Sequence, residues 1–425
     1  MSPDVESLED FRQRARTWIR ANLDPDTTGY FEALRSSGDD EEEVRRVQHD
    51  RDLQRAMFDA GLAGIIVPVE YGGQGLTPAH QRVLDEEMNG YELPRRVQVP
   101  TMSPCMAILL EFGTEEQKQR HVPPILRGEE LWMQFLSEPS GGSDVAGALT
   151  TAVRDGDEWV LNGSKIWTTG AWWSDWGLCL ARTDWDVPKH RGLTVFMLPI
   201  HQEGIEVHRI EMLNGNREFC QEFITDVRVP DSDRIGEVHD GWTVGTRWMF
   251  HERMHLHSPY VIRPSGTTHE GGTNPEVSGA FDVARASGRL EDARVRDLLG
   301  ELVVLQTVGA ELGTRIGESM RVGGRDLSAI GRLFHADASV HARTVNFELA
   351  GAAGGAWADE DGDLGQRGVD FLMRQAGSIG GGTTEMARNV ISERVLGMPR
   401  ERSLDRDIAF RDVPRGPSSR GRGAP

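Results

Sequence analysis

The feature that most constrains the fold of this chain is its hydrophobic period, which changes twice along 425 residues. Up to about residue 129, apolar residues recur at helical spacing. Between 130 and 236 the pattern becomes short alternating segments separated by Gly, Pro, Asp and Asn, which is typical of an antiparallel β domain. The helical period then returns. This order predicts a multidomain α+β protein with an N-terminal helical domain (1–129), a middle β domain (130–236) and a C-terminal helical domain (237–403).

Individual elements follow from the same periods. Helices are expected at 6–22, across 44–57, and at about 78–91, 101–111 and 115–127. Strands are expected at 150–154, 158–162, 177–183, 192–200, 205–210 and 223–230. Asp155-Gly156 and Asn162-Gly163 each lie between strand-like segments and predict tight hairpin turns, because such pairs supply the positive φ that these turns need. Residues 404–425 lack apolar periodicity and are predicted to be a disordered tail.

Composition limits the classes of partner. A net charge of −20 argues against nucleic acid or an anionic membrane as a general partner. The three cysteines, Cys105, Cys179 and Cys220, are far apart and form no CxxC pair, which fits buried thiols in a reducing compartment. No apolar run approaches the roughly 18 residues of a membrane span, and the acidic N-terminus lacks the features of a signal peptide. A soluble, cytoplasmic protein is therefore expected.

The stretch FLSEPSGGSD, residues 135–144, is a Ser/Gly-rich loop that follows an apolar run and precedes the hairpin signals. Small residues allow a flat or phosphorylated ligand to approach the main chain closely, and hydroxyl groups supply orienting hydrogen bonds. By composition alone, an ordinary surface loop is the favoured interpretation.

Glu252 is the most informative acid in the chain. In the helix predicted after Gly241, Trp248 and Met249 precede it by four and three residues, and Leu256 follows by four, so its carboxyl group projects among apolar neighbours. Such an acid either finds a buried partner or has a raised pKa, and a raised pKa suits a general base that works near neutral pH. The structural alternative is an ion pair with a neighbouring element, although Arg253 at the next position does not face Glu252 on a helix.

The same helix contains a competing motif. His251-Glu252-Arg253-Met254-His255 fits H-E-x-x-H, the signature of zinc peptidases, in which both histidines share one helical face. No G-x-x-H continuation follows, and Pro259 soon interrupts the helix. A zinc peptidase therefore stays a remote alternative.

Five blocks in one order resemble the acyl-CoA dehydrogenase family at about the family's spacing. They are GLAGIIVPVEYGGQGL (61–76), FGTEEQKQRHVPPILRGEE (112–130), the loop at 135–144, WVLNGSKIWTTG (159–170) and GGGTTEMARNVISERVLGMPRE (380–401). The resemblance implies a helical N-terminal domain, an antiparallel middle domain and a C-terminal four-helix bundle. It also implies FAD and desaturation of an acyl-CoA thioester between Cα and Cβ. In that reaction a glutamate removes the α-proton and the β-hydride passes to flavin N5, while hydrogen bonds hold the thioester oxygen.

The resemblance assigns flavin contacts residue by residue. The positions that match family contacts to the flavin, its phosphates or its ring edge are Gln134, Leu136, Ser137, Gly142, Ser143, Trp167, Thr169, Thr383 and Glu385. Ser143 also matches a contact to the pantetheine arm of the substrate, and Glu385 stands where glutamine is common. The alternatives are structural: Trp167 could be a core residue, and Thr169 a favourable strand residue.

The resemblance also bears on the catalytic base. Many family members carry the base in a Tyr-Glu-Gly-Thr turn near the C-terminus, where this chain has Gly381. A subgroup resembling isovaleryl-CoA dehydrogenase instead uses a glutamate before an arginine on the earlier helix, a pattern matched by Glu252-Arg253. We therefore expect Glu252 to be the base, Arg253 to lie at the substrate, and the N–H of Gly381 to donate to the thioester oxygen. The glycines at 380–382 would also leave room for a branched or bulky acyl group.

Two departures from the family pattern concern the part of the FAD site that a second subunit completes. The Arg-x-x-Phe-Gly segment is absent between 280 and 300, and Gln-x-x-Gly-Gly is replaced by Glu348-Leu349-Ala350-Gly351-Ala352. These losses resemble bacterial family members built from paired unlike subunits. The alternatives to an acyl-CoA dehydrogenase are thus a non-catalytic partner subunit, or a flavin oxidase or tailoring enzyme on a carrier-bound acyl group. Expected partners are an acyl-CoA, an electron-transfer flavoprotein or similar acceptor, and a like or related subunit.

Overall fold

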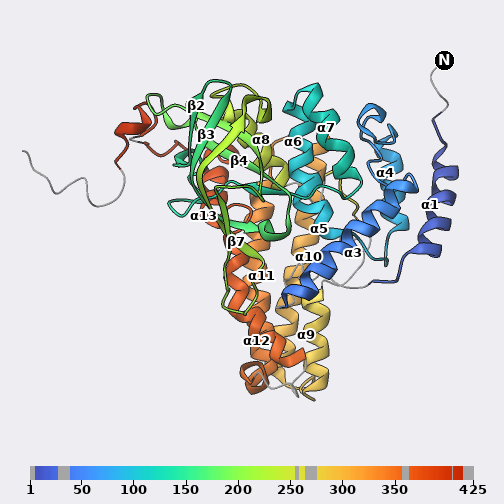
Figure 1. Ribbon diagram of the computed structural model, residues 1–425. Helices are drawn as coiled ribbons and strands as arrows, with labels where there is room; N and C mark the ends of the chain where they lie inside the picture. Colours follow the sequence, from blue (N-terminus) through green and yellow to red (C-terminus); the bar gives the residue numbers. More distant parts are fainter. Residues whose placement is uncertain are drawn as a thin grey trace, which may run out of the picture. The chain divides into compact units, whose positions relative to one another are not determined.

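The computed structural model describes residues 5–26, 39–253, 258–263, 275–356, 363–403 and 405–414. The chain forms two compact units (Figure 1). The first unit comprises residues 1–211, 216–265 and 402–425, and the second comprises 212–215 and 266–401. Within the described ranges, we find no helix with the length and apolar character needed to span a bilayer.

The N-terminal part of the first unit is helical, as its hydrophobic period predicts. Helix α1 begins after Ser7, whose side chain accepts a hydrogen bond from the N–H of Asp10 and so caps the helix. It buries Phe11, Ala15 and Ile19, which recur on one face. The helices here are α1 (Leu8–Asn22), α3 (Asp40–Asp59), α4 (Pro78–Glu87), α5 (Arg95–Val97), α6 (Ala107–Phe112) and α7 (Glu115–Leu126).

The helix expected at 101–111 is interrupted. Residues Gln98–Met106 form an irregular helical segment in which Val99 and Ser103 have extended backbone dihedral angles, and regular helix begins only at Ala107. The residue before a proline is driven away from helical dihedral angles, and Pro100 and Pro104 follow these two positions. The apolar pattern is continuous across the prolines, so periodicity alone did not reveal the interruption.

One eight-stranded sheet forms the middle of the first unit, in the order β6-β7-β3-β2-β4-β5-β8, with β1 beside β4. Most neighbours are antiparallel, as predicted, but β1 and β2 both pair with β4 in parallel. The mostly apolar segment that leads into the Ser/Gly loop forms β1. The strands are β1 (Trp132–Phe135), β2 (Thr151–Asp155), β3 (Glu158–Thr169), β4 (Trp176–Arg182), β5 (Leu193–Pro199), β6 (Ile205–Arg209), β7 (Phe219–Pro230) and β8 (Arg234–Ile235).

Only one of the two predicted hairpin turns is present. Gly156, with φ of +64°, lies in the turn between β2 and β3. Asn162-Gly163 is instead part of β3, which continues to Thr169, so the second prediction is wrong. A Cβ atom at residue 163 would lie 2.4 Å from Oγ1 of Thr150. Glycine is therefore required there by the close approach of a neighbouring segment rather than by a turn.

The sheet separates two apolar cores. On β4, Leu178 and Leu180 face a core that includes the helical segment 98–126, whereas Cys179 and Ala181 face the other core. Helix α8 (Gly241–Arg253) contributes Val244 and Trp248 to the first of these cores. For this reason α8 belongs to the first unit, although the sequence grouped it with the C-terminal helices.

The end of the chain returns to the sheet of the first unit. The predicted disordered tail is wrong for residues 405–414, because Phe410 is only 3% exposed. The N–H of Phe410 donates to the carbonyl oxygen of Val187, and its ring lies 3.6 Å from the Arg182 guanidinium carbon. Residues 415–425 lie outside the described part of the chain.

The second unit is helical and contains the predicted bundle. Its helices are α9 (Pro275–Ala286), α10 (Ala293–Arg321), α11 (Ser328–Ala350), α12 (Asp363–Met373) and α13 (Thr384–Val390). Helices α9, α10, α11 and α12 lie together in the ribbon (Figure 1). Helices α9, α10 and α11 share one apolar core, and α12 packs on α11 through the stacked rings of Phe347 and Phe371.

Candidate active site

The Ser/Gly loop starts from a strand that is tied to α8. Gln134 lies on β1, and its Oε1 atom accepts a hydrogen bond of 2.5 Å from Nε1 of Trp248. The next residues along the loop are held to β3, since the N–H of Ile166 donates to the carbonyl oxygen of Ser137 at 3.0 Å. Leu136 packs in the core that contains Trp248. The predicted residues Gln134, Leu136 and Ser137 are thus brought together with β3 and α8.

A buried ion pair closes the base of the loop. The Glu138 carboxylate accepts hydrogen bonds from Nζ of Lys165 at 2.8 Å and from the main-chain N–H groups of Leu149 and Thr150. These donors lower the pKa of Glu138 despite its burial. Between these anchors, Gly142 and Ser143 are exposed, and a Cβ atom at residue 142 would meet nothing closer than 3.8 Å. The loop therefore presents free main chain to a ligand while its base is rigid.

Trp167 occupies a strained, exposed position rather than a core position. The pairing of β3 with β7 shifts register between Ile166 and Thr168, so Trp167 is the extra residue of a bulge. It has φ of +66° and is 55% exposed, and its ring meets that of Phe219 edge-on at a centroid distance of 5.9 Å. Left-handed dihedral angles are unfavourable for a bulky residue and concentrate at functional sites. Thr169, two residues on, is half-buried at the end of the same strand.

Glu252 lies in the last turn of α8 and is half-buried. Burial raises its pKa, and the positive charge of the exposed Arg253 opposes that shift in part. Its charge also contributes to a raised pKa of the fully buried Cys105, which places it beside the segment 98–106. Leu256, expected on the same helical face, lies outside the described residues.

A cluster that the sequence did not reveal fixes the end of α8. Both Nε and Nη2 of Arg247 donate to the Glu111 carboxylate, at 2.6 and 2.8 Å, and Nε2 of His251 lies 2.7 Å from the same carboxylate. Ser103 donates to the carbonyl oxygen of His251 at 3.4 Å. These residues are far apart in sequence and each is common on protein surfaces, so no local pattern could have predicted the cluster.

The H-E-x-x-H alternative gains no support from this geometry. The ring of His251 is engaged by Glu111, and His255 lies outside the described residues. Within the part of the chain that the structure describes, no three His, Cys, Asp or Glu side chains are grouped as metal ligands would be.

The second unit carries the remaining predicted residues on one turn. Gly381 and Gly382 have φ of +70° and +98°, which only glycine adopts readily. Nη2 of Arg332 on α11 donates to the carbonyl oxygens of Gly377, Gly380 and Gly382 at 2.8–2.9 Å. Arg332 therefore fixes the glycine turn, a role that the sequence did not indicate.

Thr383 and Glu385 follow this turn. Oγ1 of Thr383 accepts a hydrogen bond from the N–H of Met386 and caps α13, so its hydroxyl group already has a structural role. Glu385 is exposed, and N–H and hydroxyl donors at the start of α13 lower its pKa. It lines a polar pocket with Asp337, His341 and Arg388, among others. The carboxylates of Asp337 and Glu385 both line this pocket. A phosphate is therefore less favourable here than it would be with glutamine, the residue common in the family, at position 385.

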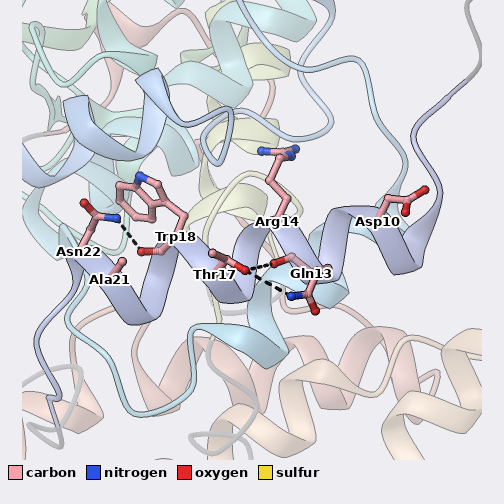
Figure 2. Close-up of a pocket in the computed structure, with 7 residues that line it drawn as sticks. All are labelled: Asp10, Gln13, Arg14, Thr17, Trp18, Ala21 and Asn22. Atoms are coloured by element: carbon pink, nitrogen blue, oxygen red, sulfur yellow. Dashed lines mark hydrogen bonds between the residues drawn. The ribbon is translucent and has the colours of Figure 1, made fainter.

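A second hollow lies along α1 and is lined by Asp10, Gln13, Arg14, Thr17, Trp18, Ala21 and Asn22 (Figure 2). Its polar side chains mainly bond along their own helix: Thr17 donates to the Gln13 carbonyl oxygen, and Asn22 donates to that of Trp18. No predicted site residue lines it. This hollow is therefore not a candidate for the chemistry.

Comparisons with known proteins identify the family. Residues 6–129 match the acyl-CoA dehydrogenase N-terminal domain, and residues 134–227 match the acyl-CoA dehydrogenase middle domain. The chain belongs to the acyl-CoA dehydrogenase family of flavin-dependent oxidoreductases, as its sequence blocks predicted.

Individual relatives span nearly the whole chain. Acyl-CoA dehydrogenase IpdE1 of Mycobacterium tuberculosis is 32% identical over 402 residues, covering 93% of this chain and 99% of that protein. The solved Tcur3481-Tcur3483 steroid ACAD is 28% identical with a TM-score of 0.69, covering 93% of this chain and 98% of that one. The ChsE4-ChsE5 complex from Mycobacterium tuberculosis is 26% identical with a TM-score of 0.64, covering 94% and 100%. These relatives support acyl-CoA dehydrogenation as the general reaction.

Proposed function

We propose that this protein is a FAD-dependent acyl-CoA dehydrogenase in which Glu252 removes the α-proton of the thioester. The observation that carries the proposal is the position of Glu252: a carboxyl group with a raised pKa, on the helix whose Trp248 donates to Gln134 of the loop strand. A base with a raised pKa holds an abstracted proton at a smaller free-energy cost than an ordinary carboxylate. Gly381, at the other family position for the base, has no side chain to compete for the role.

The first unit has the features that a flavin requires. Gln134, Leu136 and Ser137 form the start of an anchored loop, Gly142 and Ser143 are its open end, and Trp167 presents an exposed aromatic surface beside Thr169. FAD, when bound, supplies the acceptor for the β-hydride. The protein's own task is to orient the thioester, exclude water and hold the α-proton on Glu252. Arg253 is proposed to lie at the substrate, and Thr383 and Glu385 to contact the cofactor.

The test is Glu252→Gln, which keeps the size of the side chain and removes the base. We expect the purified variant to retain FAD, as measured by its absorption spectrum, but to lose flavin bleaching by an acyl-CoA that bleaches the wild type. The wild-type bleaching rate should rise with pH as Glu252 ionises, because only the anion accepts the proton.

The matched control is Glu206→Gln, the same change at an exposed carboxylate on β6. It should bleach at the wild-type rate. A Glu252→Gln protein that bleached as fast as this control would show that Glu252 is not the base. A wild-type protein that bound no flavin would contradict FAD as the cofactor.

A second candidate function is a subunit of a heteromeric dehydrogenase. Arginines in the stretch that lacks Arg-x-x-Phe-Gly are engaged locally, Arg285 with Asp282 and Arg289 with Asp292. Glu348, at the position of the family's glutamine, accepts a hydrogen bond from Arg294. The Tcur3481-Tcur3483 and ChsE4-ChsE5 structures are complexes of two named chains. Protein purified alone should then be colourless, and co-expression with a related chain that carries Arg-x-x-Phe-Gly should give yellow complex.

The proposed substrate class is a bulky or branched acyl-CoA. An added Cβ at Gly381 or Gly382 would meet nothing within 4 Å among the described residues, so this turn leaves space for a large group. One similar solved structure is named a steroid ACAD, which supports a bulky acyl group as the substrate of this protein. Comparing bleaching by butyryl-CoA and by a ring-bearing acyl-CoA would test the class, and a strong preference for butyryl-CoA would contradict it. The proposed electron acceptor is an electron-transfer flavoprotein.

A further inference from the structure

A fully buried carboxyl group lies behind the strand that carries the loop. Glu222 is on β7, with 0% exposure. Its Oε2 atom lies 3.0 Å from Oγ1 of Thr168, and Oε1 has no hydrogen-bond partner among the described residues. Burial raises its pKa to about 8, even though Thr168 and Lys165 oppose the shift. Glu222 therefore keeps its proton at neutral pH.

The charged groups around Glu222 neutralise an anion there only in part, although Lys165 is its direct partner on β3. Lys165 on β3 directs Nζ to Glu138 at 2.8 Å and to the carbonyl oxygen of Leu180 at 2.6 Å. On β6, Val207 pairs directly with Glu222, and the nearby Arg209 forms a salt bridge with Asp40. The other titratable neighbours are the thiols of Cys179 and Cys220, whose pKa values are raised by burial to about 12 and about 11.

The hydroxyl group of Thr168 links Glu222 to the candidate site. It lies 3.0 Å from Oε2 of Glu222 and 3.3 Å from the main-chain oxygen of Gln134. A hydroxyl group has one proton, and a carbonyl oxygen can only accept. When the Glu222 carboxyl is protonated, its O–H can donate to Thr168, which leaves the Thr168 proton for Gln134. When Glu222 is ionised, its carboxylate accepts the hydrogen bond from Thr168, and the bond to Gln134 is lost.

We propose that Glu222 is a positioning residue of the flavin site, whose carboxylic O–H donates to Thr168 and thereby directs the Thr168 hydroxyl group to the main-chain oxygen of Gln134. The same bonds hold the β3 bulge that exposes Trp167, because Thr168 is the next residue. Gln134 in turn accepts from Trp248, one helical turn before Glu252. The inference rests on the proposed function, because it treats Gln134 and Trp167 as flavin contacts.

The test measures FAD affinity of the full chain by flavin fluorescence between about pH 6 and 10. We expect wild-type affinity to fall about fivefold with a midpoint near 8, since one neutral hydrogen bond is lost as Glu222 ionises. Glu222→Gln should give a flat profile at the low-pH value, because its amide donates at every pH. Glu206→Gln should keep the wild-type profile, and Thr168→Val should bind FAD more weakly at all pH values.

A second readout does not depend on the cofactor. In flavin-free protein at pH 7, the infrared difference spectrum between wild type and Glu222→Gln should show a carboxylic acid C=O band of Glu222, and this difference band should disappear across pH 8. Identical pH profiles for wild type and Glu222→Gln, or no such band at pH 7, would overturn the role of Glu222 while leaving FAD binding intact. A wild-type protein that bound no FAD at any pH would overturn the proposed function itself. Glu222 would then have no flavin site to position.

Discussion

Trp167 combines two properties that stability alone does not favour, an exposed indole and a left-handed backbone. A bulky residue at φ of +66° costs of the order of 1–3 kcal/mol of folding free energy. The ring recovers little of that cost by burial, since it is more than half exposed and meets Phe219 only edge-on. The strain indicates that this position is selected for its exposed ring and not for the regularity of the strand.

Replacing Trp167 separates strain from function. Trp167→Ala removes the ring but keeps the backbone strain, whereas Trp167→Gly removes both. We expect the glycine variant to be more stable than the alanine variant by about 1 kcal/mol in urea unfolding, and both to lose FAD affinity by at least about tenfold. Equal stabilities would show that the bulge relaxes around alanine. Unchanged FAD affinity in both would remove Trp167 from the cofactor site.

The residues of the site differ in how far sequence could predict them. Glu252 and Trp167 stood out because a carboxyl group among apolar helix neighbours and a tryptophan at a fixed distance behind the loop are local patterns. Glu222 gave no such signal, because an acid on an alternating strand normally faces solvent and only the packing of β6, β7 and β3 buries it. Arg332 acts on a turn about 50 positions away in the chain, a distance no local pattern spans.

At the scale of elements, α11 controls the conformation of the glycine turn through one side chain. Arg332→Met should loosen the turn that carries Gly381 and lower kcat by about tenfold or more, with KM less affected, because a misplaced oxyanion donor acts mainly on the transition state. Arg332→Lys keeps a charged donor and should recover part of the loss. Steady-state kinetics measure this split.

The matched control for that prediction is Arg315→Met, at an exposed arginine on α10 of the same unit. It should leave kcat and KM unchanged. If Arg332→Met lowered only the melting temperature and left kcat at the control value, the arginine would be a structural residue and the turn would not need it for catalysis.

Helices and strands were predictable where apolar residues recur at a clear helical or strand period. Strands β2, β4, β5 and β6 and helices α1 and α7 appear close to their expected ranges, whereas β3 continues to Thr169 and β7 begins at Phe219. Strand β1 was not predicted as a strand because its four residues are nearly all apolar and its parallel pairing gives no alternation. Asn162-Gly163 was misassigned because a glycine needed for close approach to Thr150 has the same sequence signature as a turn glycine.

At the scale of the whole molecule, the chain end connects to the open end of the loop. Lys189 pairs with Asp144 at 2.9 Å and with Asp405 at 2.7 Å, and hydrogen bonds from Lys189 and Ser403 lower the pKa of Asp405 to about 2. Arg182 donates to the carbonyl oxygens of Ala146 and Ala148 while its guanidinium packs on Phe410. The segment 405–414 therefore supports the residues that immediately follow Ser143.

Truncation tests this connection. A chain ending at residue 403 loses the buried Phe410 ring and the Asp405 partner of Lys189, so we expect a lower melting temperature and FAD affinity reduced by about tenfold or more. Phe410→Ala in the full chain should reproduce most of the stability loss, about 3 kcal/mol by urea unfolding, because a buried ring is replaced by a cavity. A chain ending at residue 414 keeps both contacts and should match the wild type in both measurements. If the two truncated chains behaved alike, the segment would not support the loop, and the anchors at Glu138 and Lys165 would have to be sufficient to order it.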